Sequence, residues 1–529
     1  MESHFKNGAS GDFLTRLFHS VHSSDAHKTL NRLLWALPAI FLFQISYAQN
    51  YYAIQGSNYA GSLGIGNNPA SIVNTPYSWD IDILSVQAKN ATNGVTVHNY
   101  SLISSPQKSQ YSFDQGDYRR YAYADFNINL LNARIAINRK QALGFGLNLR
   151  GYAQLSTAPY SFIDTLKTTG DFFDLGNYNR KLYGDFTNSS WVEAFVTWAQ
   201  TIWDRTDNRL NAGITAKVSR GISGAYTTLQ NGSVEQTLHG NTYVYTMQDV
   251  FAEYGYSYNY DLWQKQNSTG ENLNKFVSNT RGGFSFDIGA EYLIKAAQTG
   301  SGFDEDVNSY YDYDWKIGVS ILDIGFNQYK YGRNSRVISG FQNNITDSII
   351  DNRFLHVDDL ENFNDNLQGV AQNIQQPAGL FRIINPTRAV LNVDHYLFDA
   401  FYINGNLSLN LSSLSGSQWR VTELNLLTLT PRWETKRWGV FLPVQFNTKN
   451  QFWVGGAFKA GPLLIGFHNW ANIFSKNKMQ NGGGYIALVI RARKNTQSRL
   501  DKRLDCPRNV GGTYKKNRLG QKLSCPQRP

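Results

Sequence analysis

The sequence predicts an all-β protein, a transmembrane antiparallel β-barrel of about 14 strands, with 16 as the alternative. Three observations predict this fold class. A short apolar segment near the N-terminus is typical of an export signal, many later segments alternate apolar and polar residues, and the connections between them are alternately long and short.

The export signal is the most apolar part of the chain. Its uninterrupted apolar run, residues 33–43, is eleven residues long, whereas a membrane-spanning helix needs about 20. The run fits the apolar region of a secretory signal, which has about 7 to 15 residues and ends before a small-x-small cleavage site. We expect cleavage between Ala48 and Gln49, and the absence of Cys at position 49 excludes a lipoprotein signal. The alternative is an amphipathic or buried helix in a cytosolic protein.

Residues 1–48, an N-terminal extension plus the signal peptide, are therefore expected to be removed. N-terminal sequencing of outer-membrane material should begin at Gln49 or report it as blocked pyroglutamate. A mature chain that begins at Met1 would contradict the export signal.

The amino-acid composition excludes several classes of protein. Charged residues make up 17% of the 529 residues and aromatic residues 14%, a combination that disfavours disorder. No other apolar run approaches the length of about 18 residues that indicates a transmembrane helix. The net charge of +10 equals the charge of residues 491–529, which hold twelve Lys or Arg and two Asp or Glu. We therefore expect no nucleic-acid partner.

Alternation of apolar and polar residues predicts strands with two different faces. In residues 283–294, for example, the pattern places Ile288 on the apolar, lipid-facing side and Asp287 on the polar, lumen-facing side. The polar faces are rich in Asn, Ser and Gly, and the apolar faces often begin or end at an aromatic residue, as in a membrane girdle. A soluble β-sandwich is the alternative, but its strands average about 5 to 6 residues. Phase changes at Leu130/Leu131 and at Leu426/Leu427 predict two bulges.

The connections orient the barrel. Long ones, residues 156–190, 226–282 and 330–388, alternate with short ones, residues 204–209, 397–400 and 434–437. Bacterial barrels have long extracellular loops, short periplasmic turns and an even number of strands. About 15 candidate strands are visible, so residues 79–88 and 95–103 are not expected to be two independent spans. Sixteen strands would require one more near residues 241–247.

These patterns divide the chain into four parts. Residues 1–48 are the removed segment, 49–78 an N-terminal segment that could enter the lumen as a plug, 79–493 the barrel and 494–529 a basic periplasmic tail. Cys506 and Cys525 lie in the tail and are a candidate disulfide pair in an oxidising periplasm. The tail is either a contact for a periplasmic protein or the cell wall, or a solvated end.

Two stretches resemble known families. The segment "GSLGIGNNPASI", which contains Asn68, Pro69 and Ala70, resembles the Gly-rich segment of fatty-acid-transporter-like barrels and of barrels associated with type IX secretion and gliding. Residues 439–490 and 385–398 are similar to an outer-membrane barrel family of unknown function related to both. The resemblance implies an outer-membrane barrel and supplies no catalytic residues. The chain departs from the family in having a basic tail after its last strand.

No enzyme signature is present, so we expect no enzyme, no cofactor and no metal site. The acidic run 304–314 has oxygen ligands that calcium accepts, but its spacing is not that of an EF-hand and a solvated turn is the simpler interpretation. Asp394 and His395, near a strand end, are too isolated to indicate a hydrolase.

The predicted function is a passive outer-membrane channel or transporter for small solutes, with hydrophobic ones among the candidates. The alternative is a non-transporting barrel that scaffolds a secretion, motility or surface-adhesion complex. In both cases the lipid of the outer membrane is the expected partner of the wall. Conductance of the purified barrel would distinguish them, because only a channel passes a steady current.

Overall fold

The computed structural model describes residues 52–99, 101, 109–264, 266–295, 313–398, 400–416, 418–470, 473 and 478–492. The predicted cleavage site at Ala48 and Gln49 lies outside the described residues, as do the tail with Cys506 and Cys525 and most of the acidic run 304–314.

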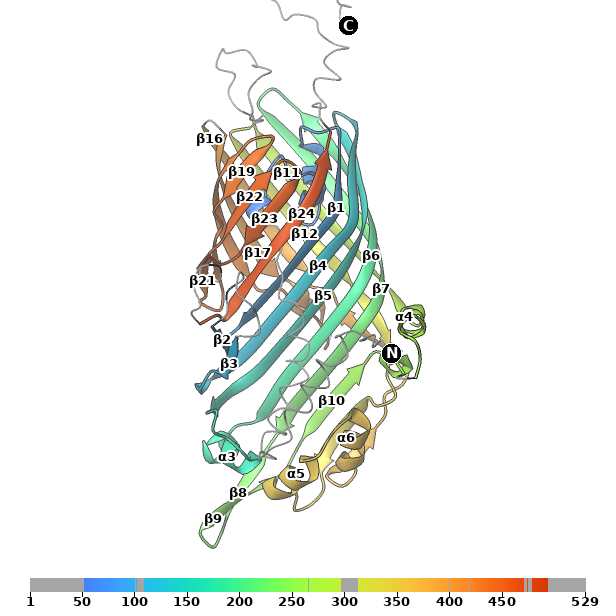
Figure 1. Cartoon of the computed structure of the whole chain (residues 1–529), viewed down its shortest axis with the longest axis vertical. Coiled ribbons are helices and arrows are strands. Elements are labelled where there is room, and N and C mark those ends of the chain that lie inside the picture. The colour runs from blue at the N-terminus through green and yellow to red at the C-terminus, as the bar shows by residue number, and fades with distance from the viewer. Residues whose placement is uncertain are drawn as a thin grey trace, which may run out of the picture.

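Fourteen antiparallel strands of the described chain close into a barrel, because the first wall strand pairs with both the second and the last (Figure 1). The predicted fold class and strand number are confirmed. In wall order the strands are β1 (Trp79–Thr92), β4 (Gly116–Asn138), β5 (Gln141–Phe162), β6 (Leu182–Asp204), β7 (Asn208–Gly232), β11 (Arg281–Ile294), β12 (Trp315–Lys330), β16 (Arg388–Phe398), β17 (Phe401–Asn410), β18 (Leu426–Glu434), β19 (Trp438–Phe441) continued by β20 (Val444–Asn447), β22 (Gly456–Ala460) preceded by β21 (Phe452–Val454), β23 (Leu463–Phe467) and β24 (Asn481–Arg491).

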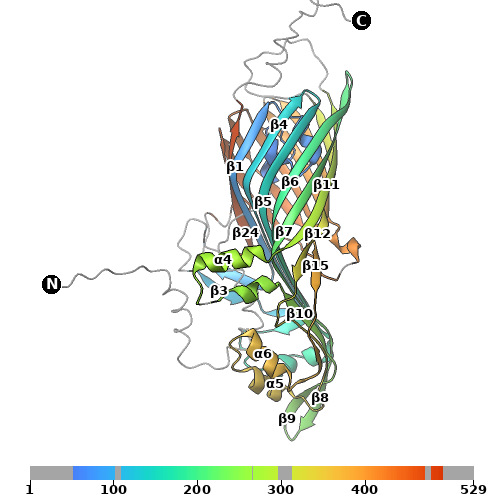
Figure 2. The same ribbon diagram turned by 90° about the vertical axis from the view of Figure 1, so that its right-hand side faces the viewer.

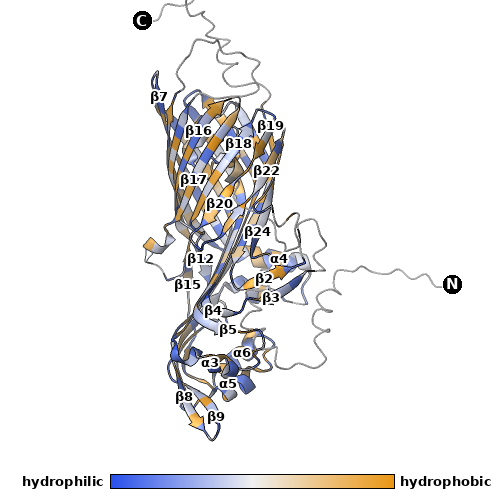
Figure 3. Cartoon of the chain, turned by 90° about the vertical axis from the view of Figure 1, so that its left-hand side faces the viewer, coloured by the Kyte–Doolittle hydropathy of each residue, from blue (hydrophilic) through white to orange (hydrophobic). Residues whose placement is uncertain are grey.

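The two faces of the wall follow the predicted alternation. Ile288 is 41% exposed and Asp287 only 1%, so the first faces lipid and the second the filled lumen. Hydrophobic and hydrophilic residues alternate along the strands of the wall (Figure 3). The bulge predicted at Leu130/Leu131 is confirmed by a register shift between β4 and β5. The bulge predicted at Leu426/Leu427 is wrong, because β18 begins at Leu426 and pairs with β17 without a shift.

The strands β4 to β7 are longer than a membrane requires. They have 22 to 25 residues, whereas about 9 to 11 residues cross a bilayer. The predicted loop 156–190 is accordingly shorter, since β5 and β6 stay paired as far as Thr157 and Gly184. The long connections 226–282 and 330–388 lie at the lower end in Figure 1, and the short turns 204–209, 397–400 and 434–437 lie at the upper end. These are the extracellular and periplasmic ends of such a barrel.

Beyond the membrane wall, the long connections and strand extensions build an outer cap (Figure 2). It contains β8 (Val234–His239), β9 (Thr242–Met247), β10 (Phe251–Tyr256), β13 (Arg336–Phe341), β14 (Ala371–Gln375), α3 (Thr169–Asp174), η6 (Asn177–Asn179), α5 (Asp347–Phe354) and α6 (Leu360–Leu367). A separate apolar core that includes Phe173, Tyr245, Ile338 and Phe354 holds it together. The β8–β9 hairpin is its own sheet, so residues 241–247 add no wall strand.

Smaller elements line the outer rim of the barrel. They are β2 (Val95–His98), β3 (Gln110–Phe113), β15 (Leu380–Ile384), η7 (Tyr258–Leu262), α4 (Thr269–Ser278) and η8 (Ser412–Ser415). Strands β2 and β3 form a two-stranded sheet outside the wall, so residues 79–88 and 95–98 are indeed not two independent spans. None of the helices in the described residues is long and apolar enough to cross a membrane.

The segment 53–78 occupies the periplasmic half of the lumen. It begins within the short 3-10 helix η2 (Tyr52–Ile54) and contains two more, η3 (Gly61–Gly64) and η4 (Pro69–Val73). Ile54 and Leu63 pack on Phe441, Leu464 and other residues of the wall, and Ile65 and Ile72 pack on Phe195 and its neighbours. We refer to residues 53–78 as the lumen segment.

Candidate functional site in the barrel lumen

The motif Asn68-Pro69-Ala70 starts the helix η4 inside the lumen. The Asn68 side-chain oxygen accepts a hydrogen bond of 2.9 Å from the Ala70 N–H, which makes Asn68 the N-cap. Pro69 occupies the first helical position, where its missing N–H costs nothing. The Asn68 amide also donates to the Ala290 carbonyl of the wall at 2.9 Å. One residue therefore both starts the turn and fastens it to β11.

Two paired glycines of the wall make room for this turn. Gly213 of β7 and Gly289 of β11 lie opposite each other. A Cβ on Gly213 would come within 2.6 Å of the Pro69 carbonyl carbon, and one on Gly289 within 2.2 Å of the Asn68 side-chain oxygen. Any side chain at Gly213 would displace the backbone of the lumen segment, so its absence permits the close approach.

Basic and hydroxyl side chains of the wall bind the irregular backbone of the lumen segment. Arg134 donates to the carbonyls of Ile72 and Tyr77 at 2.7 and 2.6 Å. The other contacts run from Lys316 to the Gly56 carbonyl at 2.5 Å, from Ser320 to the Asn67 carbonyl at 2.7 Å and from Arg388 to the Gly66 carbonyl at 3.0 Å. Buried carbonyl groups outside regular structure need such partners. The lumen segment is thus held by hydrogen bonds and packing, and none of these contacts is covalent.

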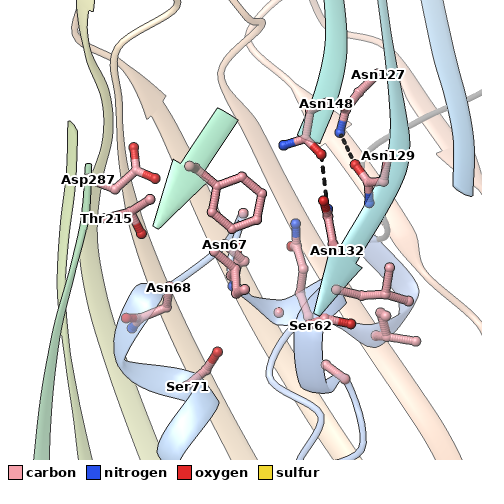
Figure 4. Close-up of a pocket in the computed structure, with 18 of the residues that line it drawn as sticks. Ser62, Asn67, Asn68, Ser71, Asn127, Asn129, Asn132, Asn148, Thr215 and Asp287 are labelled. Atoms are coloured by element: carbon pink, nitrogen blue, oxygen red, sulfur yellow. Dashed lines mark hydrogen bonds between the residues drawn. The ribbon is translucent and has the colours of Figure 1, made fainter. Parts of the chain in front are cut away.

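A cavity of about 90 Å³ lies between the lumen segment and the wall. Amide and hydroxyl groups dominate its neutral lining, with Ser62, Asn67, Asn68 and Ser71 on the segment and Asn127, Asn129, Asn132 and Asn148 on β4 and β5 (Figure 4). The lining also contains four basic residues, Arg150, Lys217, Lys316 and Arg388, and four acidic ones, Glu193, Asp287, Glu291 and Asp323. Apolar side chains, among them Leu63, Ile65 and Phe195, complete the lining, so polar and apolar groups both face the cavity.

Asp323 is the centre of the charged part of the lining. It has a φ of +59° at the point where β12 contributes one extra residue against β11, a bulge position that Asp tolerates. Its carboxylate binds Arg150 through two hydrogen bonds, of 2.5 and 2.9 Å, and accepts a third from Lys217 at 2.6 Å. Lys217 also pairs with Asp287 at 2.8 Å. These charges neutralise one another inside the lumen.

The sequence contains a signal for this bulge that our strand pattern does not use. Outward apolar positions in β12 are odd-numbered up to Ile321 and even-numbered from Ile324 onward. The change of phase marks the extra residue. It does not identify the partners, because Arg150 and Lys217 lie on distant strands.

Aromatic side chains fill the barrel on the outer side of the cavity. The Tyr152 ring stacks on Trp191 with a centroid separation of 5.5 Å, and Tyr226 stacks on Trp419 at 4.0 Å. Tyr329, Phe381 and Ile383 complete this buried cluster. The cavity therefore lies between the lumen segment on the periplasmic side and an aromatic constriction on the extracellular side.

Asp394 and His395 have structural roles. Asp394 is fully buried and binds Arg432 through two hydrogen bonds, at 2.5 and 2.8 Å. The His395 ring stacks on Trp315 at 4.0 Å and its Nδ1 bonds the Asp314 carbonyl at 2.8 Å. In the described residues no group of three or more His, Cys, Asp or Glu side chains is placed to hold a metal ion. That the protein is no enzyme stays a prediction.

The model of the family of unknown function DUF5723 matches residues 69–468, more than half of the chain. The chain belongs to this family. The match begins at Pro69, so it includes Pro69 and Ala70 of the lumen segment but not Asn68. A search of curated proteins found no match.

Several solved outer-membrane barrels have a similar fold. The toluene transporter TbuX of Ralstonia pickettii is 11% identical, with 84% of this chain and 98% of that chain covered and a TM-score of 0.37. A FadL homologue of Pseudomonas aeruginosa is 10% identical over 84% and 98%, with a TM-score of 0.38. The toluene transporter TodX of P. putida is 10% identical over 81% and 92%, with a TM-score of 0.37. At these values the resemblance does not transfer a solute or a mechanism to the DUF5723 protein.

Proposed function

We propose that this protein is a passive channel for small solutes in the outer membrane and that its lumen segment is the gate. The observation that supports the proposal is the cavity between the aromatic constriction and a segment that is held only by non-covalent contacts. Porin-like barrels conduct through a polar lumen. In this barrel, amide, hydroxyl and charged side chains line the cavity next to the lumen segment. Conduction requires the segment to move.

The contact between Pro69 and Gly213 of the wall is the most direct place to test the gate. Replacing Gly213 by Val puts side-chain atoms where the Pro69 and Ala70 backbone now lies, at 2.6 and 2.7 Å from the Cβ position. We expect the segment to leave its seat and the conductance of the purified barrel in a planar bilayer to rise several-fold. The wall itself should persist, because Gly213 keeps its pairing with Gly289.

The matched control is Gly405→Val. Gly405 is also in a wall strand, but a Cβ there would meet only the Val393 carbonyl, at 4.0 Å. This variant should conduct like the unmodified barrel. Equal currents from the Gly213 and Gly405 variants, with both barrels still resistant to heat on a gel, would contradict the gate.

A second candidate function, scaffolding of a surface complex, is favoured by the outer cap. The cap has an apolar core of its own, and its β8–β9 hairpin exposes Leu238 by 63% and Tyr243 by 53%. Exposed apolar side chains at the tip of a projecting hairpin are typical of a contact surface. If scaffolding is the function, shortening this hairpin should release co-purified proteins and leave the conductance unchanged.

We also propose the basic tail, residues 494–529, as a periplasmic contact for a protein or the cell wall. Its positive charge supports this proposal, and such a contact should weaken as salt rises, because exposed charges are screened within about 10 Å at 0.1 M salt.

A further inference from the structure

We infer that the lumen cavity is a binding site for a neutral, polyhydroxylated solute of the size of glycerol or a small sugar alcohol. The inference rests on the proposed channel, because it assigns a solute class to the same lumen. The cavity measures about 90 Å³, whereas one water needs about 10 to 15 Å³ on this measure. It therefore has room for several waters or for one small solute.

The charges of the lining do not favour an ionic solute. Arg150 and Lys217 are paired with Asp323, and Lys217 is also paired with Asp287. Lys316 lies 3.8 Å from Glu291, and Arg388 forms an ion pair with Glu423, which is not part of the lining. With four basic and four acidic residues in the lining, an anion or a cation would have to break an existing pair. Such exchange is costly in a buried site.

Neutral polar groups in the same lining lack partners. The Gln55 and Gln87 side-chain oxygens and the Ser62 hydroxyl are buried and have no hydrogen-bond partner among the described residues. Gln87 is 3% exposed and Ser62 2%. Buried polar groups are normally satisfied, so these three identify the chemistry that is missing from the cavity. Two amide oxygens need donors and a hydroxyl both donates and accepts, which matches solute hydroxyl groups.

Hydrogen bonds between neighbouring asparagines orient one more acceptor, the Asn127 side-chain oxygen. Asn127 donates through its amide nitrogen to Asn129 at 3.2 Å (Figure 4). Asn129 donates in turn to Asp82 at 2.9 Å. This chain of donors leaves the Asn127 side-chain oxygen without a partner among the described residues. The acceptor is therefore preorganised for a donor in the cavity. An apolar solute would leave all of these groups unpaired, and a site built of hydrogen-bonding groups rejects such a solute strongly.

Gly66 provides a variant that blocks the cavity without disturbing the wall. It belongs to the lining, and a Cβ placed on it would meet no atom within 4 Å. A tryptophan at this position would extend into the open space. Gln87→Leu is an independent variant, because it removes one unpaired amide and keeps the approximate volume of the side chain.

The experiment is saturation-transfer NMR on the purified full-length barrel with glycerol, erythritol and xylitol as the probes. A direct signal is preferable to a thermal shift, since polyols stabilise proteins without binding to a site. We expect saturation transfer to erythritol or xylitol in the unmodified barrel, and a several-fold weaker transfer in Gly66→Trp and in Gln87→Leu. Gln141→Leu is the matched control, because Gln141 bonds Gln200 at the periplasmic turn, away from the cavity, and it should retain the signal.

Two results would overturn the assignment. One is equal transfer in the unmodified, Gly66→Trp and Gln87→Leu barrels, which would mean contact elsewhere on the surface. The other is full competition by toluene or by glycerate, which would indicate an apolar or an anionic site. Saturation transfer measures binding independently of conductance. A barrel that binds polyols but never conducts would therefore contradict the proposed channel and not the binding site. An open channel that binds none would contradict only the solute class.

Discussion

Replacing Asp323 by alanine is expected to lower the free energy of unfolding by about 3 to 5 kcal/mol, the usual cost of removing one partner of a buried ion pair. The Arg150 guanidinium would lose both of its hydrogen bonds to the carboxylate, and Lys217 would keep only Asp287. Urea unfolding of the barrel refolded into lipid vesicles, followed by tryptophan fluorescence, measures the change.

Two variants separate the causes of this loss. Asp323→Asn keeps a side chain that tolerates the φ of +59° and removes only the charge, so it should cost less than alanine. Asp358→Ala changes an exposed aspartate of the outer cap and should stay within about 0.5 kcal/mol of the unmodified barrel. An Asp323→Ala barrel as stable as the Asp358→Ala barrel would show that the lumen charges contribute nothing to stability.

Replacing Ile288 by arginine is expected to cost about 2 to 4 kcal/mol, the penalty for a basic side chain on the lipid face near the middle of the membrane. Ile288 is 41% exposed on the outer face of β11, so no lumen contact changes. The same unfolding measurement applies, and Ile288→Val should have a much smaller effect because it stays apolar. Equal stability of the arginine and valine variants would contradict a lipid-facing wall at this position.

The Ile288→Arg experiment also needs a control substitution on the lumen side of the wall, and Asp287, which alternation suggests for it, is unsuitable. Alternation places Asp287 on the lumen face, where a substitution would be expected to be harmless. In the structure Asp287 is 1% exposed, pairs with Lys217 and accepts the Asp323 N–H at 2.7 Å. Thr428→Val on β18 is the better control, since the Thr428 hydroxyl has no hydrogen-bond partner among the described residues.

The local alternation of apolar and polar residues was sufficient to predict the two faces of regular wall strands. The side-chain period of a strand is set by the backbone itself, so the apolar and polar faces of segments such as 283–294 could be predicted from neighbours in sequence. Loop lengths and the need for an even strand number then gave fourteen strands. The length of β4 to β7 could not be predicted in this way, because their outer parts are held by pairing with each other and by the cap, and not by lipid.

What the sequence by itself determined is therefore the barrel, its number of strands and the two faces of regularly alternating strands such as 283–294. Only the tertiary structure decided what meets inside it. Asp323 and Arg150 lie 173 residues apart in sequence, and the Pro69 backbone lies against Gly213 of the wall. These contacts depend on how strands tilt and stagger when the sheet closes, which sets the height at which each inward side chain lies. Alternation is a property of each strand alone and contains no information about that height.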